Sequence, residues 1–429
     1  MVPVLTLIGG AMTELKELNV FDKILEPVFP LIKEAQNKIA GDSNDYKLSL
    51  LPFTVNLLFA IICRIESISK LVTEIKSSPV AEALELVKAS KSMYSEAFRR
   101  YDSSIFRNIF YQLLKTLNFL HIPEINQLGR ILLVDGSLFP AIASMQWAHY
   151  KKTANAIKLQ LAFELNRMIP VEFLCTNGNF SEKKFLTLIL KKGITYVCDR
   201  GYISFPMFKK ICMESAYFII RGKSNLQYAI ESQLDVVVPD KFLKFFSDIS
   251  DAKIVFNNDK NEMIYRIINF TALGESYCLI TNRFDLTTYQ VIMLYAYRWQ
   301  VELCFRFLKR TLKGIHLFTQ DENGIQIQFY LYMIGYLILL SFKQESIEVS
   351  DAYYGTTIGK AQSNEEPEQE STDKNHHSSQ RLYVQGLVSL LGSKLKKYWK
   401  ISIHWLIVLK NKLLEKFDPK IAQTLSSYN

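Results

Sequence analysis

The chain contains the segment Tyr295-Ala-Tyr-Arg298-Trp-Gln-Val-Glu302-Leu-Cys-Phe-Arg-Phe-Leu-Lys309. It has no glycine or proline and many good helix formers, so the pattern predicts a helix. At roughly 100° per residue, four polar side chains share an arc of about 60°: Tyr295, Arg298, Glu302 and Lys309. The same stripe carries two further cations, Arg306 and Lys313. One carboxylate in a row of cations and a phenol suits the joint binding of a metal ion and phosphate groups.

The opposite side of this predicted helix is apolar and would face a core. Its members are Leu294, Tyr297, Val301, Cys304, Phe305, Leu308 and Leu312. An alternative explains the polar stripe as a solvated face with i,i+4 ion pairs, such as Glu302 with Arg298 or Arg306. On the helix alone the two interpretations fit equally well.

The composition is that of a globular protein large enough for two or three domains. Of 429 residues, 49% are hydrophobic and 22% are charged. The net charge of +9 suits a polyanionic partner, although many ordinary proteins are as basic. Six scattered cysteines without a CxxC pair argue against a structural zinc site or a disulfide framework. No signal peptide is expected, and the apolar runs 50–63 and 329–342 are expected to be buried helices.

The chain changes character near residue 130. Residues 1–128 read as helical, and five short strands are then expected at 131–135, 157–165, 169–175, 194–198 and 217–220. A helix at 181–191 precedes the fourth strand. Residues 223–275 form a β-leaning insertion, followed by a strand at 277–281 and the long helix from about Thr287. Residues 346–381 are polar and low in complexity, as in a solvated linker, and 382–429 are helical again.

Two aspartates lie at the ends of apolar predicted strands: Asp135 is the last residue of one, and Asp199 directly follows another. Taken singly, each has a simpler explanation, because Asp-Gly is a common turn and Asp often caps a helix. Together with Glu302, however, they place three carboxylates where two strand ends and a helix face can converge. Oxygen ligands of this kind suit Mg²⁺, and two such ions roughly 3.5–4 Å apart can clamp an in-line phosphoryl transfer.

Three motifs stand out: Asp135-Gly-Ser, Asp199-Arg-Gly-Tyr and Tyr295-x2-Arg298-x3-Glu302-x6-Lys309. Together they resemble the signatures of bacterial DDE transposases, specifically the insertion sequence 4 family, whose Tyr-Arg-Glu-Lys spacing is matched without a gap. The resemblance covers roughly residues 45–345. One departure is Gln160, which stands where the family pattern leads us to expect histidine.

The resemblance implies an α/β fold with a ribonuclease H-like catalytic core, a β-rich insertion, and helical regions on both flanks. The implied domains are an N-terminal helical DNA-binding region at 1–128 and a catalytic domain at 129–345, with its insertion at about 223–275. A flexible linker at 346–381 and a C-terminal helical region at 382–429, suited to dimerisation, would follow.

The resemblance also implies roles for the site residues. Asp135, Asp199 and Glu302 would be the catalytic metal ligands for two Mg²⁺ or Mn²⁺ ions. Tyr295, Arg298 and Lys309 would contact the terminal phosphates of transposon DNA. The two remaining cations of the stripe, Arg306 and Lys313, would add DNA contacts.

The expected activity is cut-and-paste DNA transposition, in which metal-dependent cleavage at the element's ends is followed by attack of the freed 3′-OH on target DNA. The expected partners are double-stranded DNA, as terminal inverted repeats and as target, and a second copy in a synaptic homodimer, with no membrane. The expected location is the bacterial cytoplasm, at the nucleoid. The alternatives are a decayed or domesticated end-binding protein, another ribonuclease H-like nuclease, and a structural protein with a solvated stripe.

Overall fold

The structure is a computed structural model that describes residues 20–361, apart from 40, 42–45, 120–121, 152–153, 224, 244–245, 258, 260–262, 273–274 and 312–315. The chain divides into two compact units. One is formed by the chain before Leu120 and after Phe307, and the other is Leu120–Phe307.

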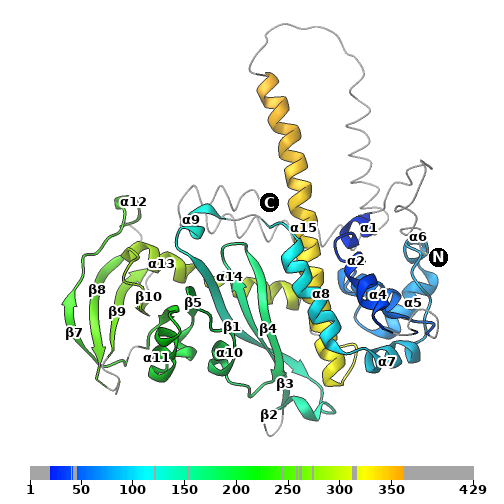
Figure 1. Ribbon diagram of the computed structural model, residues 1–429, viewed down its shortest axis with the longest axis horizontal. Coiled ribbons are helices and arrows are strands. Elements are labelled where there is room, and N and C mark those ends of the chain that lie inside the picture. The colour runs from blue at the N-terminus through cyan, green and yellow to red at the C-terminus, as the bar shows by residue number, and fades with distance from the viewer. Residues whose placement is uncertain are drawn as a thin grey trace. The chain divides into compact units, whose positions relative to one another are not determined.

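The second unit is built on a mixed sheet that contains all five expected strands: β1 (Arg130–Ala141), β3 (Ala154–Glu164), β4 (Ile169–Asn177), β5 (Ile194–Cys198) and β6 (Tyr217–Arg221). Their order is β4-β3-β1-β5-β6, and the short β2 (His149–Lys151) also pairs with β3. The strands β4, β3 and β1 are antiparallel, whereas β1, β5 and β6 are parallel. This mixed sheet with helical crossovers confirms the expected α/β fold class and is consistent with the expected ribonuclease H-like core (Figure 1).

Helices supply the crossovers that parallel strands require. Helix α10 (Glu182–Ile189) joins β4 to β5, and α11 (Phe205–Met213) joins β5 to β6. The strand β5 between these crossovers is buried along its whole length, as expected for a central parallel strand. Phe208 of α11 stacks on Phe218 of β6 with ring centroids 4.5 Å apart. The two crossover helices therefore pack on the parallel strands, α10 against β1 and α11 against β6.

The insertion continues this same sheet. Its strands are β7 (Tyr228–Gln233), β8 (Ser247–Phe256), β9 (Ile264–Ala272) and β10 (Glu275–Thr281), with a short helix α12 (Asp240–Leu243) between β7 and β8. β10 pairs antiparallel with β6, and β9, β8 and β7 follow outward in that order. The insertion is thus hydrogen-bonded to the core strands.

The long helix expected from about Thr287 is interrupted, so the prediction of one continuous helix was wrong. It consists of α13 (Thr288–Ala296), α14 (Trp299–Arg306) and a π-helical turn, η4 (Phe307–Thr311). At the break, the amides of Arg298, Gln300 and Val301 each donate to the carbonyl three residues earlier. Such 3₁₀-type bonds tighten the turn and rotate the following helix about its axis.

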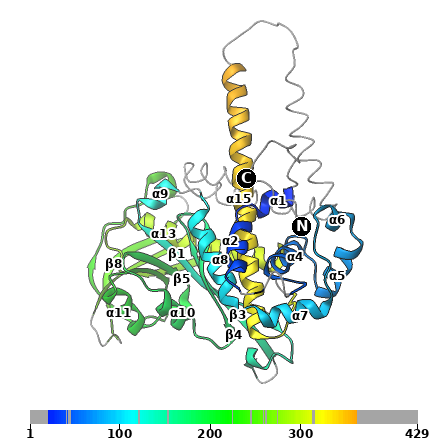
Figure 2. The ribbon, with the colours of Figure 1, turned by 45° about the vertical axis from the view of Figure 1, so that its right-hand side comes forward.

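The first unit is helical, as expected for the N-terminal region. Its helices are α1 (Val20–Leu25), α2 (Phe29–Asn37), α4 (Leu50–Ile62), α5 (Ile68–Ser77), α6 (Pro79–Ala83), α7 (Lys91–Arg100), α8 (Ser103–Thr116) and α15 (Glu322–Ala361). The short α9 (Pro123–Asn126) belongs to the second unit. Helix α15 packs against α8 and α4 (Figure 2). Residues 322–345 therefore join the N-terminal helices, where we expected them in the catalytic domain.

Helix α15 also corrects the expected linker. It continues to Ala361, so residues 346–361 are helical, and only 362–381 of the expected linker, with the expected C-terminal region 382–429, lie outside the described residues. The physical reason is that no proline interrupts the chain between Glu322 and Pro367. The part Glu322–Gln344 is long and apolar enough to cross a membrane, but 72% of its most apolar window is buried in the structure. That burial is typical of a core helix, as expected for this run.

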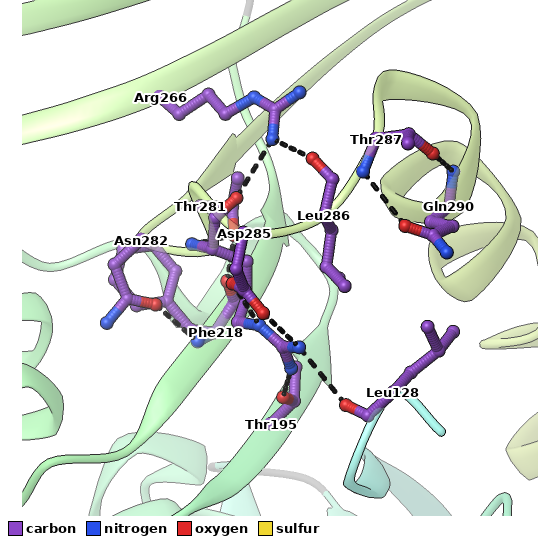
Figure 3. Close-up of polar contacts among 11 residues, drawn as sticks. Leu128, Thr195, Phe218, Arg266, Thr281, Asn282, Asp285, Leu286, Thr287 and Gln290 are labelled. Carbon is purple, nitrogen blue, oxygen red and sulfur yellow. Dashed lines mark hydrogen bonds and ion pairs between the residues drawn. The ribbon is translucent and has the colours of Figure 1, made fainter. Parts of the chain in front are cut away.

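A buried ion pair ties the insertion to the start of α13. Arg266 of β9 donates from Nε and Nη2 to the two carboxylate oxygens of Asp251 on β8, at 2.8 and 2.6 Å. Both side chains are almost completely buried. Thr288, the first residue of α13, donates from its hydroxyl to Asp251 at 2.8 Å. The Nη1 group of Arg266 donates to the carbonyl of Leu286 at 2.6 Å (Figure 3).

A second arginine, Arg283, ties the same loop to the core strands. It donates to the hydroxyl of Thr195 on β5 and, at 3.1 Å, to the carbonyl of Leu128. Its guanidinium also forms a two-pronged ion pair with Asp285, with both contacts at 2.8 Å (Figure 3). The loop that leads into α13 is therefore bound both to β9 of the insertion and to β5 of the core.

We predict that Arg266→Ala lowers the free energy of unfolding by about 3–5 kcal/mol, because it leaves the Asp251 carboxylate buried and unpaired. Urea unfolding of the purified variant measures this loss. The matched control is Arg130→Ala, since the Arg130 side chain is 45% exposed and its partner Glu164 keeps Arg167. A loss no larger than that of the control would contradict a structural role for the buried pair.

Candidate active site

Asp135 lies inside β1, which continues to Ala141, so the expectation that it ends a strand was wrong. The parallel pairing of β1 with β5 does stop at Val134, however, which is paired with Cys198. Beyond this point β1 is paired only with β3 among the described strands. Asp135 is therefore the first residue past the parallel ladder, where the neighbouring strand has already turned away.

Asp199 directly follows β5 and precedes a 3₁₀ turn, η3 (Arg200–Tyr202), as expected for a residue at a strand end. Because Val134 and Cys198 are register partners, Asp135 and Asp199 each come one residue after a paired position in neighbouring parallel strands. The backbone alone thus brings the two aspartates to the same edge of the sheet.

Arg298 joins two of the three predicted carboxylates. Its Nη1 lies 3.1 Å from Oδ2 of Asp135, and its Nη2 lies 2.7 Å from Oε1 of Glu302. The Arg298 side chain is only 13% exposed. The third carboxylate, Asp199, accepts a hydrogen bond of 3.3 Å from the hydroxyl of Tyr295. The guanidinium carbon of Arg298 also lies 5.8 Å from the ring centroid of Tyr295, so five of the predicted site residues are assembled in one network.

The charges of this network shift the pKa values of its members. Burial raises the pKa of Asp135 to about 6, while Arg298 and the backbone N–H of Gly136 oppose the shift and the charge of Glu302 adds to it. Burial also raises the pKa of Tyr295 to about 12, so its phenol is protonated and can donate at neutral pH. Burial alone would lower the pKa of Arg298, but its anionic neighbours raise it above the usual range. The guanidinium therefore stays charged.

The remaining cations of the stripe are not part of this network as described. Arg306 lies over the indole of Trp299, with its guanidinium carbon 5.5 Å from the ring centroid. Lys309 belongs to the other unit, where burial lowers its pKa. Lys313 lies outside the described residues. The DNA contacts expected of these three residues stay predictions.

Sequence reasoning missed a polar group next to Asp135. Lys158 of β3 forms an ion pair of 2.8 Å with Glu182, and the charge of Glu182 raises the pKa of Asp135 further. A Cβ atom on Gly136 would lie 2.9 Å from the amide oxygen of Gln160 and 3.1 Å from the side chain of Lys158. Glycine after the aspartate thus permits this close approach. The signals in the sequence were that glycine and the acidic residue in the first turn of α10.

Gln160 is fully buried, and its amide atoms have no hydrogen-bond partner in the described part of the chain. It stands where the resemblance led us to expect histidine, and β-sheet register places it opposite Gly136. Gln160 therefore lies directly beside the site, on the strand next to Asp135.

Comparison with protein families matches residues 126–338 to the transposase DDE domain. This segment is a transposase DDE domain. It contains all five residues of the assembled network. The finer assignment to the insertion sequence 4 family stays a prediction.

Curated relatives carry the same kind of name. A putative transposase y4zB of Sinorhizobium fredii is 25% identical over 218 residues, which are 49% of this chain and 61% of the relative. A putative transposase for insertion sequence element IS4SA of Synechocystis is 25% identical over 262 residues, 58% of this chain and 70% of the relative. A probable transposase for insertion sequence element IS5377 of Geobacillus stearothermophilus is 23% identical over 202 residues, covering 46% and 52%.

The match to y4zB spans less than two thirds of that relative's length. Among solved structures, a piggyBac transposase synaptic complex with hairpin DNA is similar with a TM-score of 0.41 and 11% identity. That similarity covers 89% of this chain and 81% of the other.

We predict that Asp135→Asn stabilises the protein at neutral pH by about 1–3 kcal/mol, the worth of one to two pKa units. The raised pKa means that ionisation of Asp135 costs stability. That cost is absent below the unfolded value of 3.8 and complete once the pH has risen through about 6. The gain should therefore vanish near pH 4, as measured by urea unfolding across this range.

Asp285→Asn is the control, for which we expect a change in stability of the opposite sign. The hydrogen bond from Arg283 lowers the pKa of Asp285, so the ionised carboxylate stabilises the fold above its unfolded pKa. Replacing Asp285 should therefore lower the stability at neutral pH. Loss of stability in Asp135→Asn at neutral pH would show that the buried charge is fully compensated.

Proposed function

We propose that the protein is a DNA transposase that cleaves DNA at the ends of its insertion sequence and transfers the freed 3′-OH to target DNA, with divalent metal ions. The observation that carries the proposal is the bridge from Arg298 to Asp135 and Glu302, beside Asp199, within a transposase DDE domain. One guanidinium contacts both carboxylates, so oxygens of Asp135 and Glu302 face a common point that is now occupied by the positive charge of Arg298.

The donor set fits a hard divalent cation in chemistry. Asp135 and Glu302 offer carboxylate oxygens, which Mg²⁺ and Mn²⁺ prefer, around a point now held by a cationic group. Within the described residues, no three acidic, histidine or cysteine side chains form a ready metal-binding group. Asp199 must therefore approach the other two to complete a three-carboxylate set. A cation bound there would neutralise charge on the phosphate under attack.

The chain's own residues orient the reacting groups. The N–H of Gly136 donates to Oδ1 of Asp135 at 2.8 Å and so orients the carboxylate, whose other oxygen contacts Arg298. The phenol of Tyr295 orients Asp199 through their hydrogen bond. Arg298 presents a planar guanidinium that suits two oxygens of a phosphate group. In the proposed complex it would bind a phosphate of the transposon end, together with Tyr295.

The proposed partners are the terminal inverted repeats and the target, both double-stranded DNA, bound by a homodimer in the synaptic complex. Arg306, Lys309 and Lys313 would add phosphate contacts that position the DNA without reading its sequence. The N-terminal helices would bind the ends, and two Mg²⁺ or Mn²⁺ ions would serve each site. The proposed location is the bacterial cytoplasm at the nucleoid.

We predict that Glu302→Gln abolishes Mg²⁺-dependent nicking and leaves DNA binding intact. Loss of a metal ligand should cost about 4 kcal/mol of transition-state stabilisation, or roughly 1,000-fold in rate. Glutamine can still accept the hydrogen bond from Arg298, so the fold is kept. The assay uses labelled DNA carrying the repeats that flank the gene, with and without Mg²⁺.

The matched control is Glu231→Gln, an exposed glutamate on β7. It should nick and bind as the parent protein does. If the parent binds the repeats but does not nick them in Mg²⁺ or Mn²⁺, the protein is an end-binding relative without activity. Equal nicking by Glu302→Gln and the parent would remove Glu302 from the site.

A further inference from the structure

The parallel strands of the core place a cation in line with the two aspartates. Register pairs Val134 with Cys198 and Cys198 with Ile220 across β1, β5 and β6. The residues that come next along these strands are Asp135, Asp199 and Arg221. Neighbouring strands lie about 4.8 Å apart. Arg221 thus begins one strand spacing from Asp199, at the same edge of the sheet.

Arg221 is one of the residues that line a cavity of about 390 Å³ on the insertion. The lining includes three cations and three aromatic side chains: Arg200, Arg221, Lys223, Tyr228, Phe270 and Tyr277. Arg200 is the residue directly after Asp199. The lining of the cavity therefore begins one residue after Asp199 and includes residues of β7, β8, β9 and β10.

One wall of the cavity is a cation on an aromatic stack. Arg221 is the register partner of Leu279 on β10, and Tyr277, two residues earlier, is the partner of Phe270 on β9. These side chains therefore share one face of the sheet. The guanidinium carbon of Arg221 lies 4.7 Å from the ring centroid of Tyr277, and Tyr277 stacks on Phe270 at 5.1 Å with an interplanar angle of 9°.

The cavity has an excess of positive charge. In the described part of the chain, no ion pair involves Arg200, Arg221 or Lys223. By contrast, three less exposed arginines of this unit, Arg266, Arg283 and Arg298, each form an ion pair with a carboxylate. The single acidic residue of the lining, Asp248, accepts a hydrogen bond from the hydroxyl of Ser247.

We propose that this cavity binds backbone phosphates of the DNA strand as it leaves the active site past Asp199, with Arg221 and Lys223 as the main contacts. The proposal rests on the proposed function and adds a second DNA-binding site on the insertion. Guanidinium and ammonium groups that have no carboxylate partner in the described part of the chain suit phosphate oxygens, and the aromatic wall tolerates any base sequence. These contacts position the strand without reading it.

A purely structural role explains less of this arrangement. Packing of Arg221 on Tyr277 could by itself brace the edge of β6, as other cation–π contacts do. That role gives no reason for exposed Lys223 and Arg200 to lie around the same cavity, directly after the strand end that carries Asp199. An anionic strand accounts for all three cations together.

The test measures how the affinity of the full chain for a short mixed-sequence duplex depends on salt, by fluorescence anisotropy. Each phosphate contact contributes about −0.9 to the slope of log K against log salt concentration. The paired substitution Arg221→Gln with Lys223→Gln should therefore reduce the magnitude of the slope by about 2, and Lys223→Gln alone by about 1. Arg221→Lys keeps the charge and should keep the parental slope.

The matched control removes two exposed lysines of the same unit that lie outside the cavity lining, as Lys192→Gln with Lys209→Gln. Its slope should stay parental. A parental slope in the cavity variants, or an equal reduction in the control, would overturn the inference and leave the proposed function standing if Glu302→Gln still abolishes nicking. A parent that neither binds nor nicks DNA would overturn both. Circular dichroism of each variant checks that a changed slope does not come from unfolding.

Discussion

The active-site arrangement depends on the ionic bridge from Arg298 to Asp135 and Glu302. The two carboxylates repel each other, as the contribution of Glu302 to the raised pKa of Asp135 shows. Because Arg298 is mostly buried, its charge acts through a medium of lower dielectric constant than water and is weakly screened. In the proposed function, the same guanidinium that joins the two carboxylates would also bind a phosphate of the DNA. One side chain would then both assemble the site and attract its substrate.

The position of Arg298 is determined by elements far from it in the sequence. It lies at the break between α13 and α14, so its direction depends on where α13 begins. That point is fixed by Thr288, which donates to Asp251, and by Arg266, which donates to the carbonyl of Leu286. The ion pair of Asp251 and Arg266 lies on two strands of the insertion. The insertion is therefore part of the scaffold that orients the carboxylates.

The sequence predicted the five core strands and five polar residues that the structure brings together, but it did not predict details set by tertiary contacts. Apolar runs next to Asp135 and Asp199 located β1 and β5, because central parallel strands are apolar throughout. The break at Arg298 carries no glycine or proline, so no local signal marks it. Asp135 was misplaced at a strand end because the extension of β1 depends on pairing with β3, which local propensity does not report. The DNA contacts of Arg306, Lys309 and Lys313 are still predictions.

The continuous sheet fixes the distances between the candidate site and the insertion. Productive geometry has to be held to about 0.5 Å, which side chains on rigid elements achieve better than side chains on loops. Here β6 is hydrogen-bonded to β5 on one side and to β10 on the other. The distance from Asp199 to the aromatic wall at Tyr277 is therefore set by strand spacing and cannot vary as it would between separately folded modules. If the insertion binds DNA as proposed, it would hold the strand in fixed register with the carboxylates, because both lie on one hydrogen-bonded sheet.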